Sequence, residues 1–393
     1  MQNSDIKRAN KRNLVKLLYS NSDWSKQSLA KRLNLSPSVV TRICEELINQ
    51  KIITLADPIA GDHVGRKATQ LKINANFRYC VGITTNEHTS KLVLTDMAWH
   101  TLAEENMTTD SDPKQFVNQL YENLRLLLQA HDISWQDLLG IGISLKGKTD
   151  GQIAYYGVWA QPFDLLAALK QKLSVPVVID NGVRSSAIVE QLRYAKTNFV
   201  LIKYITAGIG AAWVRHDQVR YGENNNAADF GHMIIDPTQD FCPLCKRRGC
   251  LESLISIDRT IHTLTAQFSP TKTPILWEIC QHDSHNITPE TLVQAADAGS
   301  IPVNINFTQN AQRLAQALIN AESLLDVTHI TLIGNFFDSK KFTAYFENSL
   351  NSLQLTPLTF DLAIRSHRDN LLAPVALVIS QYFLENLDEF PSL

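Results

Sequence analysis

The chain has 393 residues, too many for one hydrophobic core, so two or three domains are expected. No apolar run approaches the roughly 20 residues of a membrane-spanning helix, and the first residues lack the pattern of a signal peptide, so we expect a cytoplasmic protein without membrane insertion. The net charge of −2 conceals an asymmetry: residues 1–75 carry 13 Lys or Arg against 6 Asp or Glu, and the remainder carries 24 against 33. A basic head on an acidic body indicates a polyanionic partner for the head alone, although a solvated basic surface would have the same charge.

The first 50 residues have the pattern of three short helices. Apolar residues recur at helical spacing in 6–20, in 25–34 and in 36–50. The second and third stretches each begin with a serine suited to cap a helix, and in the third Pro37 occupies the first helical position, where its missing N–H costs nothing. Two short helices joined by a tight turn predict a helix-turn-helix. The side chains expected to face its core are Leu14, Leu17, Leu18, Leu29, Ala30, Leu33, Val40, Ile43, Leu47 and Ile48.

Two β-prone pieces, 51–56 and 68–74, flank a glycine-containing segment and predict a hairpin, the wing of a winged helix-turn-helix. Arg66 in this wing suits a minor groove, where narrow A·T-rich geometry concentrates negative potential. The N-terminal end of the third helix offers the short polar side chains that a major groove admits. Alternatively, two amphipathic helices form an interaction module with no DNA role. The residues expected to contact DNA are Ser36, Ser38, Val39, Thr41, Arg42, Arg66 and Lys67.

From Phe77 onward the pattern changes to alternating strands and helices, which predicts an α/β body. The body is long enough for two lobes, and a cleft between lobes is the default place for a small ligand. Strands are expected at 79–85, 90–97, 138–145, 175–180, 199–205 and 329–335, and helices at 114–130, 164–173, 183–195, 288–300 and 306–325.

Three cysteines, Cys242, Cys245 and Cys250, crowd into nine residues and follow His232 in the chain. In a large chain without an export signal this spacing favours a metal site over disulfides. One imidazole and three thiolates complete a tetrahedral zinc shell with no position for water, which describes a structural site. The basic run 246–248 can offset part of its negative charge, and incidental reduced thiols are the alternative. Buried thiols are expected for the isolated Cys44, Cys80 and Cys280.

The motif GHMIIDP…CPLCKRRGCLES resembles the signature of the ROK family, which contains bacterial repressors and sugar kinases. The head resembles the winged helix of the family's repressor branch, so the resemblance spans essentially the whole chain. It implies an α/β protein in which an N-terminal winged helix-turn-helix precedes an actin-like (ribonuclease H-like), two-lobed sugar-kinase body with a sugar in its cleft. It also implies one structural Zn²⁺ per chain at the four ligands named above.

The resemblance also implies a set of sugar-binding residues. Asp229 stands where the family usually has glutamate (ADFGH for GEIGH), and Glu252 matches the glutamate of GCLE. Ionised carboxylates of this kind accept hydrogen bonds from sugar hydroxyls. Asn181 matches the asparagine of the family's asparagine–aspartate pair, and His232 is expected near the sugar as well as on the metal. For Asp229 and Glu252 the alternative is helix capping or support of the zinc ligands.

The sequence departs from the family pattern in several places. The first two cysteines are spaced C-x-x-C rather than C-x-C, and the wing reads GRK where GRP is usual. Phosphoryl transfer requires a base for the sugar hydroxyl and backbone amides around the ATP phosphates. The family's kinases carry the base as the aspartate of a pattern like END-A-N. Here the stretch IDNGVRSSA places Gly182 at that position, and Asp180, two residues earlier, is not expected to reach the same point.

The phosphate loops point the same way. The Asp- and Gly-rich first loop of the kinases is replaced by GITTNEHTS. The second loop survives as TAGIGAA, residues 206–212, although glycines also serve tight turns. We therefore predict that the protein is not an enzyme, with ATP-dependent hexose phosphorylation as the alternative.

Together these features predict a transcriptional regulator, a repressor of sugar uptake or catabolism genes, that binds double-stranded operator DNA and is controlled by a sugar or sugar phosphate. A single helix-turn-helix per chain favours a homodimer or a dimer of dimers on a palindrome. Control by a sugar-transport protein instead of a free sugar stays open as an alternative. The expected domains are the head, 1–76; the first lobe, 77–185 with a C-terminal helix at 372–390; and the second lobe, 186–371, with the zinc site and a dimerisation surface.

Overall fold

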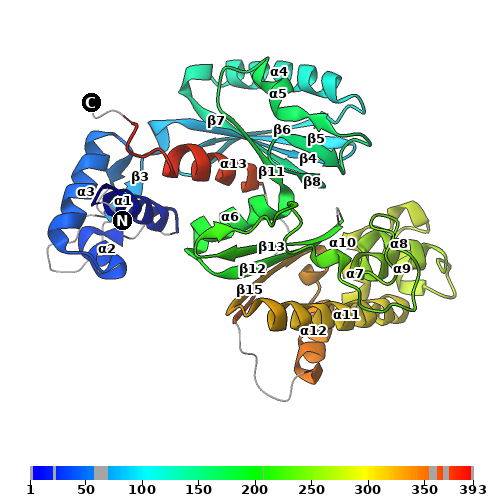
Figure 1. Cartoon of the computed structure of the whole chain (residues 1–393). Helices are drawn as coiled ribbons and strands as arrows, with labels where there is room; N and C mark the ends of the chain where they lie inside the picture. Colours follow the sequence, from blue (N-terminus) through cyan, green and yellow to red (C-terminus); the bar gives the residue numbers. More distant parts are fainter. Residues whose placement is uncertain are drawn as a thin grey trace, which may run out of the picture. The chain divides into compact units, whose positions relative to one another are not determined.

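The computed structural model describes residues 3–20, 24–56, 70–206, 208–353, 361–365 and 371–390. The chain divides into two compact units, 1–196 with 371–393, and 197–370 (Figure 1). The unit boundary lies after Lys196, whereas the domain boundary predicted at 185–186 falls inside helix α6 (Gly182–Tyr194). Within the described ranges no helix has the length and hydropathy needed to cross a membrane.

Three helices form the head, and they confirm the predicted helix-turn-helix: α1 (Asn3–Ser20), α2 (Lys26–Leu33) and α3 (Pro37–Asn49). Ser25 caps α2 through a capping box, as its position predicts. Asn34, with a φ of 53°, makes the left-handed turn that ends α2.

The predicted core of the head is confirmed except at two positions. Leu33 and Ile48 are only half-buried, while Cys44 is fully buried. The cause is helical spacing: Val40, Ile43, Cys44 and Leu47 form one i, i+3, i+4, i+7 stripe, which leaves Ile48 at its edge. Cys44 is therefore the buried thiol that its isolation predicted, and it belongs to the core of the helix-turn-helix.

The two predicted wing strands pair as expected. Strands β2 (Ile53–Leu55) and β3 (Gln70–Ile73) are antiparallel, and the short β1 (Trp24–Ser25) adds to the other edge of β3. The tip of the predicted wing, with Arg66 and Lys67, lies outside the described residues.

A five-stranded sheet of order β11-β7-β4-β5-β6 forms the centre of the rest of the first unit. β4, β5 and β6 form an antiparallel meander, and β7 and β11 continue from β4 in parallel. The strands are β4 (Tyr79–Thr85), β5 (Thr89–Asp96), β6 (Thr101–Thr108), β7 (Leu138–Leu145) and β11 (Val177–Asn181), and the helices are α4 (Pro113–Ala130), α5 (Leu165–Lys170), α6 and α13 (Ala373–Val378). A smaller sheet holds β8 (Lys148–Thr149), β9 (Ile153–Tyr156) and β10 (Phe163–Asp164).

The second unit repeats this topology. Its sheet has the order β14-β13-β12-β15-β16, again an antiparallel meander of three strands followed by two parallel strands. The strands are β12 (Phe199–Ile205), β13 (Gly208–Arg215), β14 (Gln218–Val219), β15 (His329–Gly334) and β16 (Asp361–Arg365), and the helices are α7 (Leu251–Ile255), α8 (Ile257–Thr265), α9 (Pro274–Ile279), α10 (Pro289–Asp297), α11 (Ile301–Leu325) and α12 (Lys340–Leu353). Two similar halves are what the expected two-lobed fold requires.

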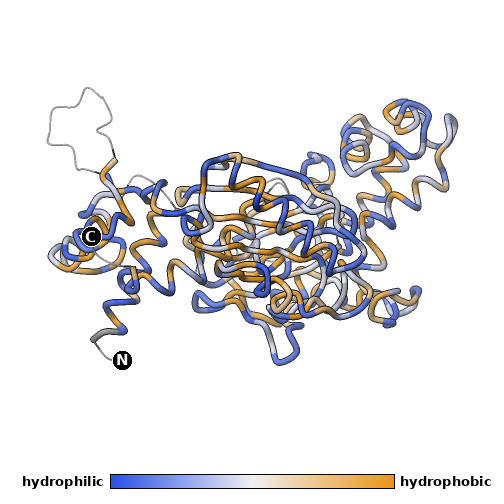
Figure 2. Tube along the Cα trace, turned by 90° about the horizontal axis from the view of Figure 1, so that it is seen from above, coloured by the Kyte–Doolittle hydropathy of each residue, from blue (hydrophilic) through white to orange (hydrophobic). Residues whose placement is uncertain are grey.

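Each sheet supports its own apolar core. Apolar residues recur at intervals along the helices, as Figure 2 shows by hydropathy, and they pack inward from α4 in the first unit and from α11 in the second. Helix α13 approaches the first sheet very closely, because a Cβ on Gly142 would lie 1.8 Å from the carbonyl oxygen of Pro374 and one on Gly82 would lie 2.8 Å from its ring. These two glycines therefore allow α13 to pack against β4 and β7.

Several strands were not predicted, and β6 and β13 show two reasons for this. The edge strand β6 is largely exposed and polar, so its sequence has little of the apolar alternation of a half-buried strand. The segment predicted as a phosphate loop, 206–212, lies mostly in β13, where Gly208 and Gly210 pair with β12. Helix α11 begins at Ile301, earlier than the predicted 306, because Pro302 lies in its first turn.

Candidate functional site

The structure brings the four predicted metal ligands together. His232 lies at the end of a short 3₁₀ turn, and the three cysteines lie in the loop between it and α7. Their ligand atoms all lie within 4.8 Å of one another. The Sγ atoms of Cys245 and Cys250 are 3.3 Å apart, and the Sγ of Cys242 is 3.7 Å from the Nδ1 of His232. Around a tetrahedral zinc ion with Zn–S bonds of about 2.3 Å and a Zn–N bond of about 2.0–2.1 Å, two sulfurs lie about 3.8 Å apart and a sulfur and a nitrogen about 3.6 Å apart. The four ligand atoms lie near these separations, so the residues fit the ion.

Backbone geometry explains why this loop closes. The N–H of Cys242 donates to the carbonyl of Arg247 (2.7 Å), and the N–H of Lys246 donates back to Cys242 (3.0 Å). Gly249 has a φ of 66°, and a Cβ there would lie 1.7 Å from the carbonyl oxygen of Asp236. Only glycine fits this position, which turns the chain so that Cys250 returns to the other ligands.

The thiols differ in acidity. Burial opposes ionisation of Cys245, but hydrogen bonds from Arg247 and from the neighbouring thiols lower its pKa to about 7. Burial and the adjacent Cys245 raise the pKa of the Cys250 thiol to about 12. A divalent cation among the sulfurs would favour all the thiolates, since the thiolate is the form that binds metal.

The predicted sugar residues of the second unit lie around this loop. The half-buried Glu252 accepts a hydrogen bond at Oε2 from the N–H of Ile209 (2.6 Å), and its carboxylate lies against Gly208 and Gly231. Asp229 is exposed, 4.0 Å from the guanidinium of Arg247. Glu252 therefore ties α7, which follows the metal loop, to the start of β13. A role of these carboxylates in sugar binding stays a prediction.

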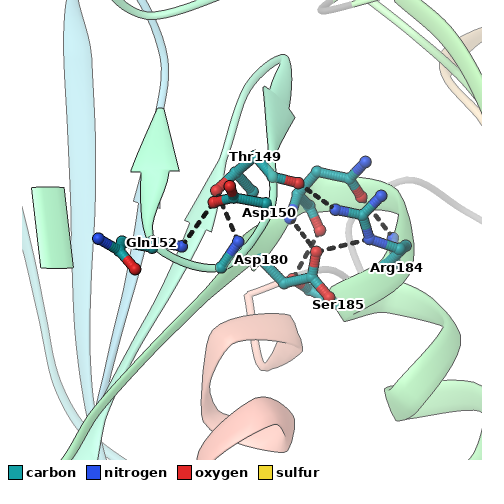
Figure 3. Close-up of polar contacts among 8 residues, drawn as sticks. Thr149, Asp150, Gln152, Asp180, Arg184 and Ser185 are labelled. Atoms are coloured by element: carbon teal, nitrogen blue, oxygen red, sulfur yellow. Dashed lines mark hydrogen bonds and ion pairs between the residues drawn. The ribbon is translucent and has the colours of Figure 1, made fainter. Parts of the chain in front are cut away.

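In the first unit, Asp180, Arg184 and Thr149 form a tight polar cluster where β11 meets α6 (Figure 3). The side chain of Asn181 caps α6, accepting from the N–H of Arg184 (2.8 Å). The Asp180 carboxylate accepts from the Nε of Arg184 (2.6 Å) and from the N–H of Asn181 (2.7 Å), and Arg184 also donates to the carbonyl of Thr149 (2.8 Å). Asp180 and Arg184 are both buried.

This cluster bears on the question of a catalytic base. Gly182 is the first residue of α6 and offers no side chain at the predicted base position. Asp180, the neighbouring carboxylate in sequence, is held in an ion pair with Arg184. A carboxylate fixed in this way is a poor acceptor for a sugar proton, because the guanidinium stabilises its charged form.

The first phosphate loop of the kinases also has a different counterpart here. The corresponding segment forms the turn between β4 and β5, where the N–H of Asn86 donates to the carbonyl of Thr89 (2.9 Å). Glu87 at this turn pairs with Lys146 (3.1 Å). The turn therefore holds a charge-compensated pair, and its sequence lacks the aspartate and the glycine pair of the kinases' first phosphate loop.

The start of α3 presents the predicted DNA-reading residues to different degrees. Ser36, Ser38 and Arg42 are exposed, whereas Val39 and Thr41 are half-buried. The hydroxyl of Ser36 caps the helix at the N–H of Val39 (3.4 Å) and lies 3.0 Å from the hydroxyl of Ser38. The N-terminus of α3 therefore combines exposed hydroxyls with one exposed guanidinium, a combination suited to a nucleic-acid groove.

Comparison with known proteins agrees with these features. The sequence model of the ROK family matches residues 80–373, and a model of winged helix-turn-helix DNA-binding domains matches residues 7–54. The chain belongs to the ROK family. Relatives within the family include the N-acetylglucosamine repressor of Escherichia coli O6:H1, 22% identical over 404 residues and 97% of each chain. The xylose repressor of Caldicellulosiruptor bescii is 24% identical over 393 residues, which cover 95% of this chain and 96% of that protein.

Solved ROK structures show the same fold. A ROK family transcriptional regulator, a homologue of the Escherichia coli MLC protein, has a TM-score of 0.75 at 22% identity over 98% of both chains. A ROK family glucokinase from Streptomyces griseus, in complex with glucose and AMPPNP, has a TM-score of 0.63 at 18% identity over 77% of this chain and 98% of the enzyme. The predicted combination of a winged helix with an actin-like, kinase-type body is thus confirmed.

Three contacts at the candidate sites were not predicted. The pairing of Asp180 with Arg184, the carbonyl of Thr149 beneath that guanidinium, and the N–H of Ile209 on Glu252 all involve residues outside the predicted site. Only the first left a signal in the sequence, since Asp180 and Arg184 are four residues apart at the start of a predicted helix. The other two depend on loops that meet only in the folded chain.

Proposed function

We propose that this ROK protein is a transcriptional repressor that binds operator DNA through its head and is controlled by a sugar or sugar phosphate bound by its body. The observation that carries the proposal is the pairing of a helix-turn-helix with a kinase-type body in which Gly182 occupies the position of the base. The names of its relatives, repressors for N-acetylglucosamine and xylose, support the same function.

The body binds rather than catalyses in this proposal. Asn181, Asp229, His232 and Glu252 are the residues assigned to the effector, and none of them stands at the base position. A catalytic step would need a carboxylate there and amides arranged around phosphates. The Asp180–Arg184 pair and the turn that holds Glu87 supply neither. Incubation with ATP and a panel of hexoses should therefore give no turnover at ordinary kinase rates, and turnover at such rates would refute this part.

Zinc has a structural part in the proposal. When bound by His232, Cys242, Cys245 and Cys250, a four-coordinate Zn²⁺ supplies a cross-link with no open position for substrate. Glu252 joins α7, which follows the metal loop, to β13, and Asp229 lies 4.0 Å from Arg247 of the loop. In this proposal, folding of the metal loop helps to position the carboxylates of Asp229 and Glu252.

The decisive experiment is DNA selection with the purified chain. A duplex enriched from random-sequence DNA should bind as a palindrome, because one helix-turn-helix offers few contacts and a homodimer doubles them. Arg42→Ala should weaken binding by about 1–3 kcal/mol, the value of one base-reading contact. Arg125→Ala, the same chemical change on α4 of the body, is the matched control and should bind as the wild type does. Failure to enrich any duplex would overturn the proposal.

A regulator controlled by a sugar-transport protein is the second candidate. It is supported by the replacement of the family's glutamate by Asp229, which shortens one arm of the assigned sugar site. Calorimetry of the full chain with free sugars and sugar phosphates separates the two. Heat of binding from any of these favours a small effector, and its absence across the panel favours a protein.

A further inference from the structure

One buried cation joins the head to the C-terminal segment of the chain. Lys11 on α1 is completely buried. Its ammonium contacts the carboxylate of Glu46 on α3 and, at 2.5 Å, the carboxylate of Asp388. Asp388 follows α13 and the π-helical turn η7 (Ile379–Leu384), so it belongs to the segment that packs on the sheet of the first lobe. Lys11 thus lies between the helix that reads DNA and the segment that ends the body.

Physical chemistry makes this contact more than a surface ion pair. A buried ammonium needs counter-charge, because removal from water is costly unless the charge is paired. Both carboxylates supply it and both keep some contact with solvent, with 26% of the Glu46 side chain and 46% of the Asp388 side chain exposed. Hydrogen bonds from Lys11 and Lys7 outweigh the opposing effect of burial and lower the pKa of Glu46, so Glu46 is charged. If Asp388 moves away, Glu46 on α3 becomes the remaining counter-charge of the buried ammonium, so the position of Asp388 affects the electrostatic environment of α3.

Further contacts surround the buried lysine. Arg12 pairs with Glu385 (2.7 Å), and the side-chain amide of Gln50, which ends α3, donates to the carbonyl of Phe390 (2.7 Å). The ring of Tyr19 meets that of Phe383 edge-on at 6.4 Å. The C-terminal segment therefore touches both α1 and the end of α3.

The same junction is incompletely satisfied. Among the described residues, buried polar atoms without a hydrogen-bond partner include Tyr19 Oη, Trp99 Nε1, Gln50 Oε1 and Arg12 Nε. The Tyr19 ring lies 5.3 Å from that of Trp99, so these groups gather where the head meets the body. Unpaired buried polar groups weaken a contact, and a weak contact is one that can open and close.

We infer that Lys11 is a positioning residue for DNA reading: bridged by Glu46 and Asp388, it latches α3 to the C-terminal segment and so fixes the orientation of the recognition helix relative to the first lobe. The inference rests on the proposed function, because it assigns to these three residues the route by which the body controls the head. Opening the latch frees the head, and a freed head loses the fixed spacing that a two-headed operator complex needs.

The test removes the body side of the latch. Asp388→Asn leaves Lys11 paired with Glu46, so the head stays folded. Glu389→Gln is the matched control, since Glu389 is an exposed carboxylate in the same segment that forms no ion pair with any of the residues described. Hydrogen–deuterium exchange of the full-length, DNA-free protein should show amides of α3 exchanging about fivefold faster in the Asp388→Asn chain than in the control. A purely local role of Asp388 would speed exchange in the C-terminal segment alone.

The second readout is affinity for the duplex selected with the wild-type chain. We expect the Asp388→Asn chain to bind at least about fivefold more weakly at equal salt and the Glu389→Gln chain to bind as the wild type does. Unchanged α3 exchange, or unchanged affinity, overturns the latch. If the wild-type chain binds no duplex, the proposed function fails, whereas the exchange experiment still decides whether Asp388 holds α3.

Discussion

At the scale of single residues, the proposal that this chain is not a kinase rests on the cluster at the start of α6. Gly182 offers no side chain at the predicted base position, and Arg184 holds the nearby acid Asp180 in a buried ion pair. The sequence alone allowed the first of these conclusions, because the position is read directly from IDNGVRSSA. It did not show the second, because a charge pair at i, i+4 is as common on a solvated helix face as in a core.

The buried pair gives a stability prediction. Arg184→Met leaves the Asp180 carboxylate buried without its partner, so unfolding in urea should show a loss of about 3–5 kcal/mol. The exposed pair of Arg125 with Glu122 provides the comparison, and Arg125→Met should cost at most about 1 kcal/mol. Adding Asp180→Asn should recover part of the loss. Equal effects of Arg184→Met and Arg125→Met would contradict the buried pair.

The metal loop gives a prediction about pH. In metal-free protein the pKa of Cys245 is lowered to about 7, whereas that of Cys250 is raised to about 12. The thiolate is the nucleophile, so iodoacetamide should label Cys245 first, and the rate should fall as the pH drops through about 7. Zinc should protect all three cysteines. Mass spectrometry would identify the labelled cysteine at each time point. If Cys242 or Cys250, which are buried, were labelled faster than Cys245, the loop would be arranged differently.

At the scale of elements, sequence patterns predicted the continuously apolar strands and the long helices α4 and α11. They missed the helices α8 and α12 and the strands whose form depends on neighbours. The buried strands β4, β7 and β12 match their predicted ranges, because a continuous apolar run is visible without any context. β6 and β13 were missed, since one is polar on an edge and the other is rich in glycine. The clustering of His232 with the three cysteines could be predicted because their spacing is itself a motif. The contact of Lys11 with Asp388 joins residues more than 370 positions apart, and no local pattern reveals it.

The requirement for glycine at position 249 of the metal loop can be tested by comparison with Gly299. Both Gly249 and Gly299 have positive φ, but a Cβ on Gly249 meets the Asp236 carbonyl whereas a Cβ on Gly299 meets nothing within 4 Å. Gly299→Ala should cost only the strain of the left-handed conformation, about 1–2 kcal/mol. Gly249→Ala should in addition displace the loop, so native mass spectrometry should find less than one zinc ion per chain. Full zinc content in the Gly249→Ala chain would contradict the assigned turn.

At the scale of the whole molecule, charge is divided by domain: the first 75 residues are basic and the remainder is acidic. An acidic body is repelled by duplex DNA and leaves binding to the head. The two units repeat one sheet topology, as a two-lobed, kinase-type body requires. After the second unit the chain returns to the first, so residues 371–393 complete the unit that begins at the N-terminus. Composition and periodicity describe short stretches of sequence, so they do not predict that the last residues pack against the first unit.

This division predicts strong dependence on salt. A dimer that neutralises about 6–10 phosphates should lose about 10³–10⁵ in affinity between 50 and 200 mM salt, which titrations at several salt concentrations would measure. Lys31→Ala, at an exposed position near the end of α2, should lower the slope if this residue contacts phosphate, and sedimentation should show a dimer on the DNA. Binding that is indifferent to salt would contradict a basic head as the DNA-binding surface.

The close packing of α13 on Gly82 and Gly142 has a consequence for biosynthesis. The strands β4 and β7 leave the ribosome early, whereas α13, which covers them, is synthesised only after the whole of the second unit. During translation one face of that sheet therefore remains without its own cover while residues 197–370 are made. The first unit reaches its complete core only when the chain has returned to it.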